Sequence, residues 1–171
     1  MLRSDYDGQT CSIARTLEIV GERWTMLVLR DVFLGLRRFD EIQSDLGVAR
    51  NTLTNRLDKL VDAGILERVP YQERPVRHEY LLTEKGLDLW PVIVSLLQWG
   101  DEYAPSDAGR PVLLRHRGCG GELDRHRVCT TCGAALGPRD VEALPGPGVS
   151  PDHPLMVRRA QAEQAKARAV R

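Results

Sequence analysis

The residues of this 171-residue chain best suited to chemistry are three cysteines and a histidine in its C-terminal third. The segments HRGCG (116–120) and CTTCG (129–133) repeat one pattern, in which a His or Cys is followed three residues later by Cys-Gly. Thiolate sulfur and imidazole nitrogen are donors that zinc prefers, and two such knuckles are typical of a zinc ribbon. The spacing predicts a Cys3His site for Zn²⁺ made of His116, Cys119, Cys129 and Cys132.

Protein would fill all four positions of this site, so the metal would be structural and not catalytic. A segment of about 30 residues has too little apolar material to fold alone, and a bound metal would stabilise it. Two alternatives stay open. His126 could replace His116 as the fourth ligand. The cysteines could also form a disulfide, which the knuckle spacing and a cytosolic setting disfavour.

A fourth cysteine, Cys11, opens the first expected helix. A helix N-terminus would stabilise a thiolate at Cys11. The residue could instead be a structural cysteine buried at an interface between two copies of the chain.

A second group of residues is suited to binding DNA. Arginine can bond guanine, and asparagine can bond adenine, through two hydrogen bonds each. Arg74 and Arg77 flank Pro75, which stiffens a loop that could meet phosphates. The candidate DNA contacts are Arg37, Arg38, Arg50, Asn51, Thr52, Thr54, Asn55, Arg56, Arg74 and Arg77. The alternative is an ordinary solvated helix face.

The elements that must position these residues follow from apolar spacing. Residues 39–46 and 49–63 read as two amphipathic helices joined by a tight turn at Gly47. Residues 65–71 and 77–82 read as two strands joined by the basic loop. A helix-turn-helix followed by a β-hairpin is a winged helix, whose second helix can enter a major groove of DNA. The expected fold is therefore mainly α with a small β-hairpin (α+β), followed by a small zinc-ribbon-like module.

Three further helices are expected. Residues 11–20 form the first, with Thr10 as its N-cap, and residues 23–34 form the second. Residues 84–104 form a long helix that Thr83 caps and that Pro91 kinks or splits. Apolar residues occupy two faces of this helix, so one face can pack on its own domain while the other needs a partner. The simplest partner is a second copy of the chain.

Composition and charge set the domain organisation. The chain is 42% hydrophobic and 28% charged, which fits a soluble globular protein. We expect a DNA-binding and dimerisation domain over 1–105, a linker and zinc-ribbon-like module over 106–148, and a basic tail over 149–171. Residues 1–105 carry 13 Lys and Arg against 17 Asp and Glu, which counts against indiscriminate phosphate binding. The N-terminus lacks the apolar core of a signal peptide and no apolar run could span a bilayer, so a cytoplasmic protein without membrane contact is expected.

The stretch from Cys11 to Trp99 resembles the HxlR family of bacterial transcriptional regulators, relatives of the MarR group. The matching motifs are Cys11, GERW (21–24), GLRRF (35–39), LTNRL (53–57), GIL (64–66), RP (74–75), YLLT (80–83), Gly86 and Trp99. The resemblance implies a homodimeric winged helix on a near-palindromic operator, with the first and last helices at the dimer interface. This chain has Ser12 where the family usually has proline after the first-helix cysteine. The resemblance also implies that Cys11 could sense oxidants, as that cysteine does in some members.

The function expected from these observations is a sequence-specific regulator, acting as a repressor on double-stranded DNA. Its effector would be an oxidant at Cys11, or a small apolar ligand between the first and last helices near Trp24, Trp90 and Trp99. The alternative is a protein-interaction adaptor, because winged helices and zinc ribbons also serve that role. An enzyme is not expected, since the sequence shows no nucleophile–base pairing, open metal site or phosphate loop.

Overall fold

The computed structural model describes residues 6, 10–151, 153 and 156, and it divides the chain into two units, Met1–Leu89 and Trp90–Arg171. The expected domain boundary after residue 105 falls inside the second unit; this boundary and the one after residue 148 stay predictions. Most of the expected basic tail lies outside the described residues. No described helix combines the length and the apolar character needed to cross a membrane.

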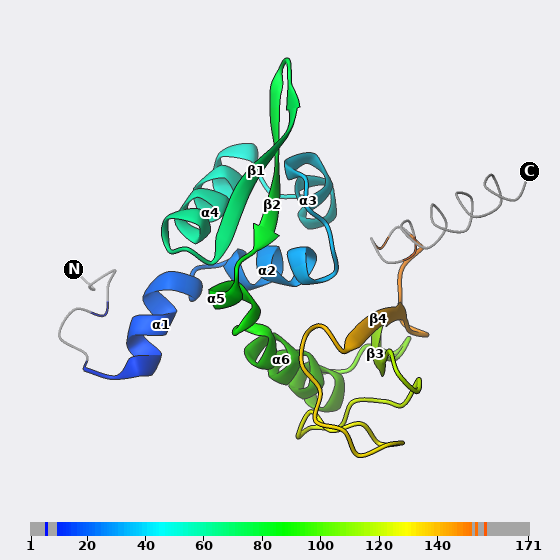
Figure 1. Cartoon of the computed structure of the whole chain (residues 1–171). Helices are drawn as coiled ribbons and strands as arrows, with labels where there is room; N and C mark the ends of the chain where they lie inside the picture. The colour runs from blue at the N-terminus through cyan, green and yellow to red at the C-terminus, as the bar shows by residue number, and fades with distance from the viewer. Residues whose placement is uncertain (1–5, 7–9, 152, 154–155, 157–171) are drawn as a thin grey trace, which may run out of the picture. The chain divides into compact units, whose positions relative to one another are not determined.

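The first unit contains four helices that share one core: α1 (Ser12–Val20), α2 (Thr25–Phe33), α3 (Phe39–Leu46) and α4 (Arg50–Asp62) (Figure 1). Apolar residues at helical spacing on the last three helices are completely buried. They are Val28 and Leu29 on α2, Ile42 on α3, and Leu53, Leu57 and Leu60 on α4. The inward face that periodicity predicts for α4 is thus the buried face, with α1 and α2 among its neighbours, and it leaves the polar face of α4 in solvent.

The turn between α3 and α4 depends on one glycine. Gly47 ends α3 with a φ of 60°, the left-handed region that favours glycine. At the other end of α3, the carboxylate of Glu41 accepts hydrogen bonds from the backbone amides of Arg37 and Arg38 at 3.1 and 3.0 Å. Helix α3 therefore has the bounds that the sequence predicts.

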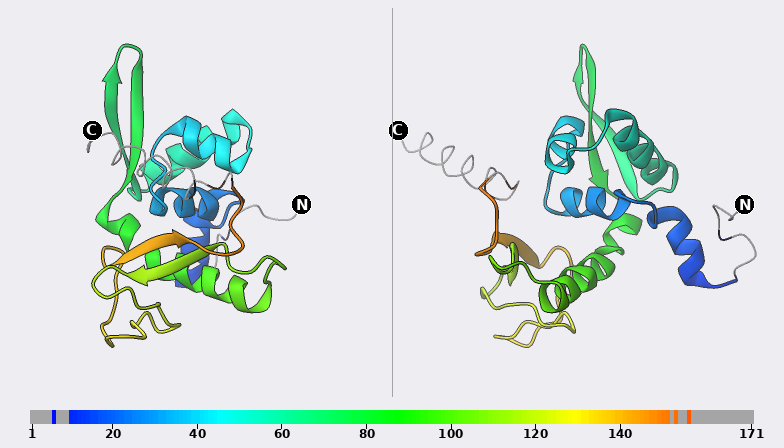
Figure 2. Two further views of the ribbon diagram at one scale, coloured as in Figure 1. Left: turned by 90° about the vertical axis from the view of Figure 1, so that its right-hand side faces the viewer. Right: turned by 180° about the vertical axis from the view of Figure 1, so that it is seen from behind.

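A β-hairpin follows and forms the wing. Strand β1 (Leu66–Glu73) pairs antiparallel with β2 (Val76–Leu82), and Arg74 and Pro75 lie at the tip. Figures 1 and 2 show the hairpin projecting past α3 and α4. The segment before α3 extends this sheet, because Arg38 bridges to Glu79 and the amide of Tyr80 donates to the carbonyl of Arg37 at 2.7 Å.

Several helix starts differ from the sequence-based expectation. Cys11, not Thr10, is the N-cap of α1, and its side chain makes no capping hydrogen bond. Helix α2 begins at Thr25 because Trp24 adopts a left-handed φ of 79°, which breaks the helical path predicted from residue 23.

The expected long helix is split into two. Thr83 caps the short α5 (Glu84–Leu87), accepting a hydrogen bond from the amide of Gly86 at 3.1 Å. The longer α6 (Trp90–Tyr103) opens the second unit, with Pro91 in its first turn, where a proline needs no amide partner. Trp90 and Val94 are buried, whereas Val92, Leu96, Trp99 and Tyr103 form an exposed apolar stripe.

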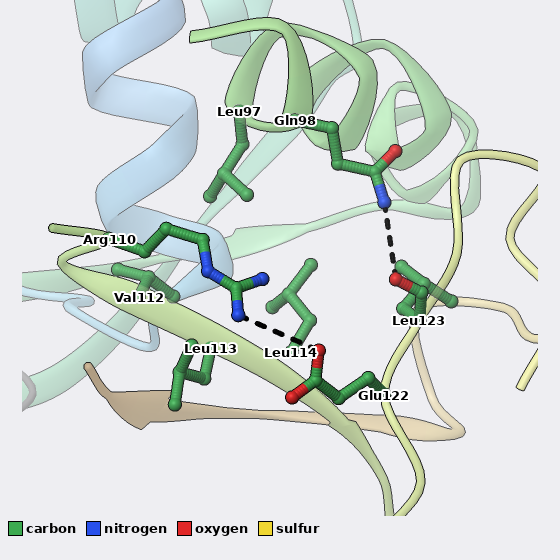
Figure 3. Close-up of a pocket in the computed structure, with 8 residues that line it drawn as sticks. All are labelled: Leu97, Gln98, Arg110, Val112, Leu113, Leu114, Glu122 and Leu123. Carbon is green, nitrogen blue, oxygen red and sulfur yellow. Dashed lines mark hydrogen bonds and ion pairs between the residues drawn. The ribbon is translucent and has the colours of Figure 1, made fainter. Parts of the chain in front are cut away.

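The rest of the second unit is a small antiparallel sheet with two cysteine-containing turns. Strand β3 (Val112–His116) pairs with β4 (Val141–Pro145). Helix α6 is bonded to the loop between them, because the side-chain Nε2 of Gln98 donates to the carbonyls of Asp124 at 2.9 Å and Leu123 at 3.5 Å. Figure 3 shows Gln98 pointing at this loop beside a cavity of about 30 Å³, the volume of one water molecule.

Candidate nucleic-acid interface and metal centre

The exposed face of α4 is polar at its N-terminal half. Arg50, Asn51, Thr54 and Asn55 are exposed, and Thr52 is half-buried. Local hydrogen bonds order part of this face: the hydroxyl of Thr54 donates to the carbonyl of Arg50 at 2.9 Å, and the carboxamide oxygen of Asn51 accepts from the amide of Thr52 at 2.8 Å. The N-terminal half is the part of a recognition helix that meets base edges.

A groove separates the start of α4 from the wing. Its volume is about 430 Å³, and its lining carries three guanidinium groups and a single carboxylate. The lining residues come from the start of α3, the start of α4 and both wing strands: Arg38, Phe39, Asp40, Arg50, Tyr71, Pro75, Val76, Arg77, His78 and Tyr80. Two of its arginines lie over aromatic rings, with the Arg38 guanidinium carbon 4.4 Å from the Tyr71 ring centre and that of Arg50 4.7 Å from Phe39. The groove is a cationic surface of defined shape.

The remaining expected contact residues do not all share this environment. Arg37, Arg74 and Arg77 are exposed. Arg56 is largely buried and forms an ion pair with Glu22, and its Nε donates to the carbonyl of Arg23 at 3.1 Å. The pKa of Glu22 is lowered, mostly by a hydrogen bond from the side chain of Lys59 and also by the charge of Arg56. Arg56 thus links α4 to the segment just before α2.

Sequence reasoning missed Tyr71, His78 and Glu79 in this region. His78 is half-buried and lines the groove. Tyr71 is the extra residue of a β-bulge, since Pro70 pairs with His78 and Gln72 with Arg77. A bulge redirects a side chain, and Pro70 inside a predicted strand was the signal that could have indicated one.

The second unit brings His116, Cys119, Cys129 and Cys132 together. Their ligand atoms lie within 4.8 Å of one another. The Nδ1 atom of His116 is 3.3 Å from the sulfurs of both Cys119 and Cys132, and the sulfurs of Cys119 and Cys129 are 3.4 Å apart. A tetrahedral Zn²⁺ with ligands at roughly 2.0–2.3 Å needs edges of about 3.5–3.8 Å, close to these separations. The cluster could hold a metal ion.

The two knuckles have the same backbone geometry. The amide of Gly120 donates to the carbonyl of His116 at 2.8 Å, and Gly133 donates to Cys129 at 2.9 Å. Both glycines have a φ of 73°. Backbone amides also point at the sulfurs: those of Cys132 and Thr131 donate to Cys129. The amide of Gly121 donates to Cys119, but the neighbouring thiols and burial leave the pKa of Cys119 raised overall. The Cys132 amide is the largest cause that lowers the pKa of Cys129 to about 6, which favours the thiolate that a metal requires.

The alternatives to this ligand set have less support in the structure. His126 is exposed and is not part of the cluster. All four cysteines of the chain are free, and a sulfur separation of 3.4 Å is well beyond a disulfide bond of about 2.05 Å.

The arginines of the cysteine-rich segment are paired with nearby acids. Arg115 lies 3.0 Å from Glu122, Arg125 lies 3.1 Å from Glu102, and Arg117 lies 4.0 Å from Glu142. These pairs neutralise part of the positive charge of this segment.

Comparison with known proteins gives one consistent result. The model of the HxlR-like helix-turn-helix family matches residues 19–108. The HTH-type transcriptional regulator Rv3095 of Mycobacterium tuberculosis (strain ATCC 25618 / H37Rv) is 52% identical over 137 residues, which is 80% of this chain and 87% of that protein. The HTH-type transcriptional regulator YdeP of Bacillus subtilis (strain 168) is 34% identical over 100 residues, or 58% of this chain and 77% of that protein.

Two solved structures are similar as well. The crystal structure of PA1607 has a TM-score of 0.63 and 38% identity, covering 79% of this chain and 94% of that one. The redox regulator HypR in its oxidized form has a TM-score of 0.51 and 30% identity, covering 54% of this chain and 96% of that one.

Proposed function

Because the chain belongs to the HxlR-like helix-turn-helix family and is a transcriptional regulator of the helix-turn-helix type, we propose that it is a repressor acting as a homodimer on a near-palindromic operator. The observation that carries the proposal is the cationic groove between α4 and the wing. Because the proposed partner is double-stranded DNA, the proposed location of the protein is the cytoplasm.

In this proposal the exposed face of α4 reads bases and the arginines around it bind phosphates. Arg50, Asn51, Thr52, Thr54 and Asn55 would lie in the major groove. Arg37, Arg38, Arg74 and Arg77 would meet the phosphate backbone on either side. Arg56 is left out of the contact surface because Glu22 and the Arg23 carbonyl already bind it.

The homodimer is supported by apolar side chains that each unit leaves in solvent. Leu96, Trp99 and Tyr103 on α6 are 54–61% exposed, and on α1 Ile13 is 69% exposed. Exposed apolar stripes of this size on helices are usual where another chain packs. A second copy of this chain is the proposed occupant, through the helices that the family resemblance implies.

We also propose that Zn²⁺ is the metal of the cysteine cluster. Three thiolates and an imidazole suit zinc better than a hard cation, and four protein ligands leave no open position for catalysis. His116, Cys119, Cys129 and Cys132 would hold the ion, which would stabilise a segment with little apolar core.

The proposed signal is an oxidant, with Cys11 as the residue that reacts. Cys11 is exposed at the start of α1, and the similar protein HypR is named a redox regulator. A purely structural role of Cys11 in the dimer is the competing interpretation, as is a small apolar ligand in place of an oxidant.

The experiment is a fluorescence-anisotropy measurement with genomic DNA fragments, including the region upstream of the gene itself. A site bound at least a hundredfold more tightly than bulk DNA, and lost on Arg50→Ala or Asn51→Ala, would support the regulator. Arg117→Ala, which removes an exposed charge far along the chain, is the matched control and should bind as the wild type does. Release of DNA on oxidation that Cys11→Ser abolishes would support the redox signal. A folded, zinc-loaded dimer with no preferred site would contradict the proposal and favour the adaptor.

A further inference from the structure

Two aromatic residues hold arginines in the groove beside the recognition helix. Tyr71 on the wing lies against Arg38, and Phe39 at the start of α3 lies against Arg50. The four side chains come from three different elements, and all of them line the same groove. We propose that Tyr71 and Phe39 are positioning residues, which hold Arg38 ready for a DNA phosphate at the groove and Arg50 ready for the bases that α4 meets. This inference rests on the proposed function.

Arg38 is held from several directions. Its backbone bridges to Glu79, and its amide donates to the carboxylate of Glu41 at 3.0 Å. Its Nε lies 3.2 Å from Oε1 of Glu79, and its guanidinium carbon lies over the Tyr71 ring. The ion pair uses Nε, and the terminal nitrogens form no hydrogen bond with another described residue. Their N–H groups can therefore donate to a phosphate.

The bulge explains why Tyr71 reaches Arg38. In a regular strand successive side chains point to opposite faces of the sheet. The register shift between Pro70 and Gln72 leaves Tyr71 as an unpaired extra residue, and this changes the direction of its side chain. Pro70 cannot donate a ladder hydrogen bond, so the irregularity costs the sheet little at this position.

Arg50 is arranged in a simpler way. It is the first residue of α4, and its guanidinium lies over the ring of Phe39, the first residue of α3. Within the described part of the chain, Arg50 forms no ion pair with a carboxylate. Stacking on an aromatic ring thus restrains the side chain without neutralising its charge.

The benefit of this arrangement is entropic. A free arginine side chain loses rotamer freedom when a phosphate fixes it. Where an aromatic ring has already fixed the side chain, less freedom is lost on binding, and the affinity is higher for the same contacts. The groove is lined by three guanidinium groups and by one carboxylate, that of Asp40. Its excess of positive charge favours binding of an anion.

The test is a pair of double-mutant cycles on the operator fragment found for the wild type. Tyr71→Ala should weaken binding about two- to fivefold, the range expected for an exposed cation–π contact. The same substitution should have almost no further effect in an Arg38→Ala protein. Tyr71→Phe keeps the ring and should restore most of the affinity, whereas Tyr71→Leu keeps only apolar bulk and should not. Phe39→Leu should behave in the same way with Arg50→Ala.

The dependence of DNA affinity on salt concentration shows whether Arg38 contacts a phosphate group. Arg38→Ala should reduce the slope of log affinity against log salt by about one and weaken all DNA sequences alike, as expected for a lost phosphate contact. Thermal unfolding of each variant distinguishes weaker DNA binding from loss of folding. If Phe39→Leu is unstable, the double-mutant cycle of Tyr71 and Arg38 still tests the inference.

Each outcome gives a decision. Additive losses in both cycles, or equal losses for Tyr71→Phe and Tyr71→Ala, would overturn the inference while the regulator stands. Failure of the wild type to bind any fragment would overturn the proposed function, and the inference with it.

Discussion

The carboxylate of Asp31 lies against the guanidinium of Arg30, with Oδ1 2.6 Å from Nη2, while its other oxygen has no hydrogen-bond partner among the described residues. Asp31 is completely buried in α2, and Arg30 also reaches Asp45 at 2.5 Å. Burial raises the pKa of Asp31 to about 7; Arg30 opposes this shift and Asp45 adds to it. A carboxyl group near neutral pKa therefore lies in the core of the DNA-binding unit.

This buried acid predicts a stability that depends on pH. The folded chain keeps a proton on Asp31 between about pH 4 and pH 7, where the unfolded chain has lost it. The contribution of this residue to the free energy of unfolding should fall as pH rises through that range and level off above it. Asp31→Asn should remove the decline and be more stable than the wild type at pH 8 by roughly 1–3 kcal/mol. Urea unfolding of both proteins from pH 5 to pH 8 measures the difference curve, and a difference that does not change with pH would contradict the assignment.

The metal cluster predicts one zinc ion per chain with a defined ligand set. His116→Ala and Cys129→Ser should each reduce zinc content, measured by mass spectrometry of the purified protein, to below a fifth of the wild-type value. His126→Ala is the matched control, because His126 is exposed and is not part of the cluster, and Cys11→Ser is a second one. Normal zinc in His116→Ala together with loss in His126→Ala would reverse the choice of histidine.

Zinc removal should affect the two units differently. The sheet of β3 and β4 should become sensitive to protease on chelation, because a small segment without its metal has little apolar core. The helix-turn-helix has its own core of Ile42, Leu53 and Leu57 and should keep its helical signal in circular dichroism. Loss of the entire helical signal on chelation would show that the units do not fold independently.

Substitution of Arg56 should lower the stability of the fold, whereas substitution of Arg50 should lower the affinity for DNA. Arg56→Ala removes the ion pair to Glu22 and the bond to the Arg23 carbonyl, so it should lower the free energy of unfolding by about 1 kcal/mol. Its DNA affinity, measured where both variants are folded, should remain within a factor of about two. Arg50→Ala should show the opposite behaviour, with unchanged unfolding and a loss of affinity of tenfold or more. A large loss of affinity in folded Arg56→Ala would return Arg56 to the contact surface.

If the exposed apolar stripe of α6 is the dimer interface, a charged residue introduced into the stripe should dissociate the dimer. Leu96→Glu and Trp99→Glu should each weaken self-association by at least tenfold, because a carboxylate in an apolar interface loses its hydration. Analytical ultracentrifugation over a range of concentrations measures the effect. Val69→Glu places the same charge at an exposed apolar residue of the wing and should leave association unchanged. Unaltered association in both α6 variants would exclude this helix from the interface.

Local sequence patterns predicted the elements whose signals are local. The bounds of α3 followed from Gly47 and from the spacing of its apolar residues, and the four zinc-type residues followed from a repeated spacing. The start of α2 was not predictable in this way, because the left-handed Trp24 lies in a sequence that continues the helical pattern. Pro91 left open whether a kink or a split would follow, and the structure contains a split.

Contacts between distant segments were the part of the site that sequence could not reveal. Arg56 has the residue type and spacing of a DNA contact, and only the position of Glu22, 34 residues earlier, shows it to be bound within the chain. The stacking of Tyr71 on Arg38 likewise depends on a strand register and a bulge that no local pattern determines.

Helix α6 carries both the exposed apolar stripe and the hydrogen bond from Gln98 to the loop between the two cysteine knuckles. In a dimer that pairs through this helix, zinc binding and subunit association become linked equilibria. Zinc would then bind more tightly at protein concentrations where the dimer forms, and the dimer would be more stable in zinc-replete cells. The amount of regulator able to occupy a palindromic site would then depend on metal supply as well as on gene expression.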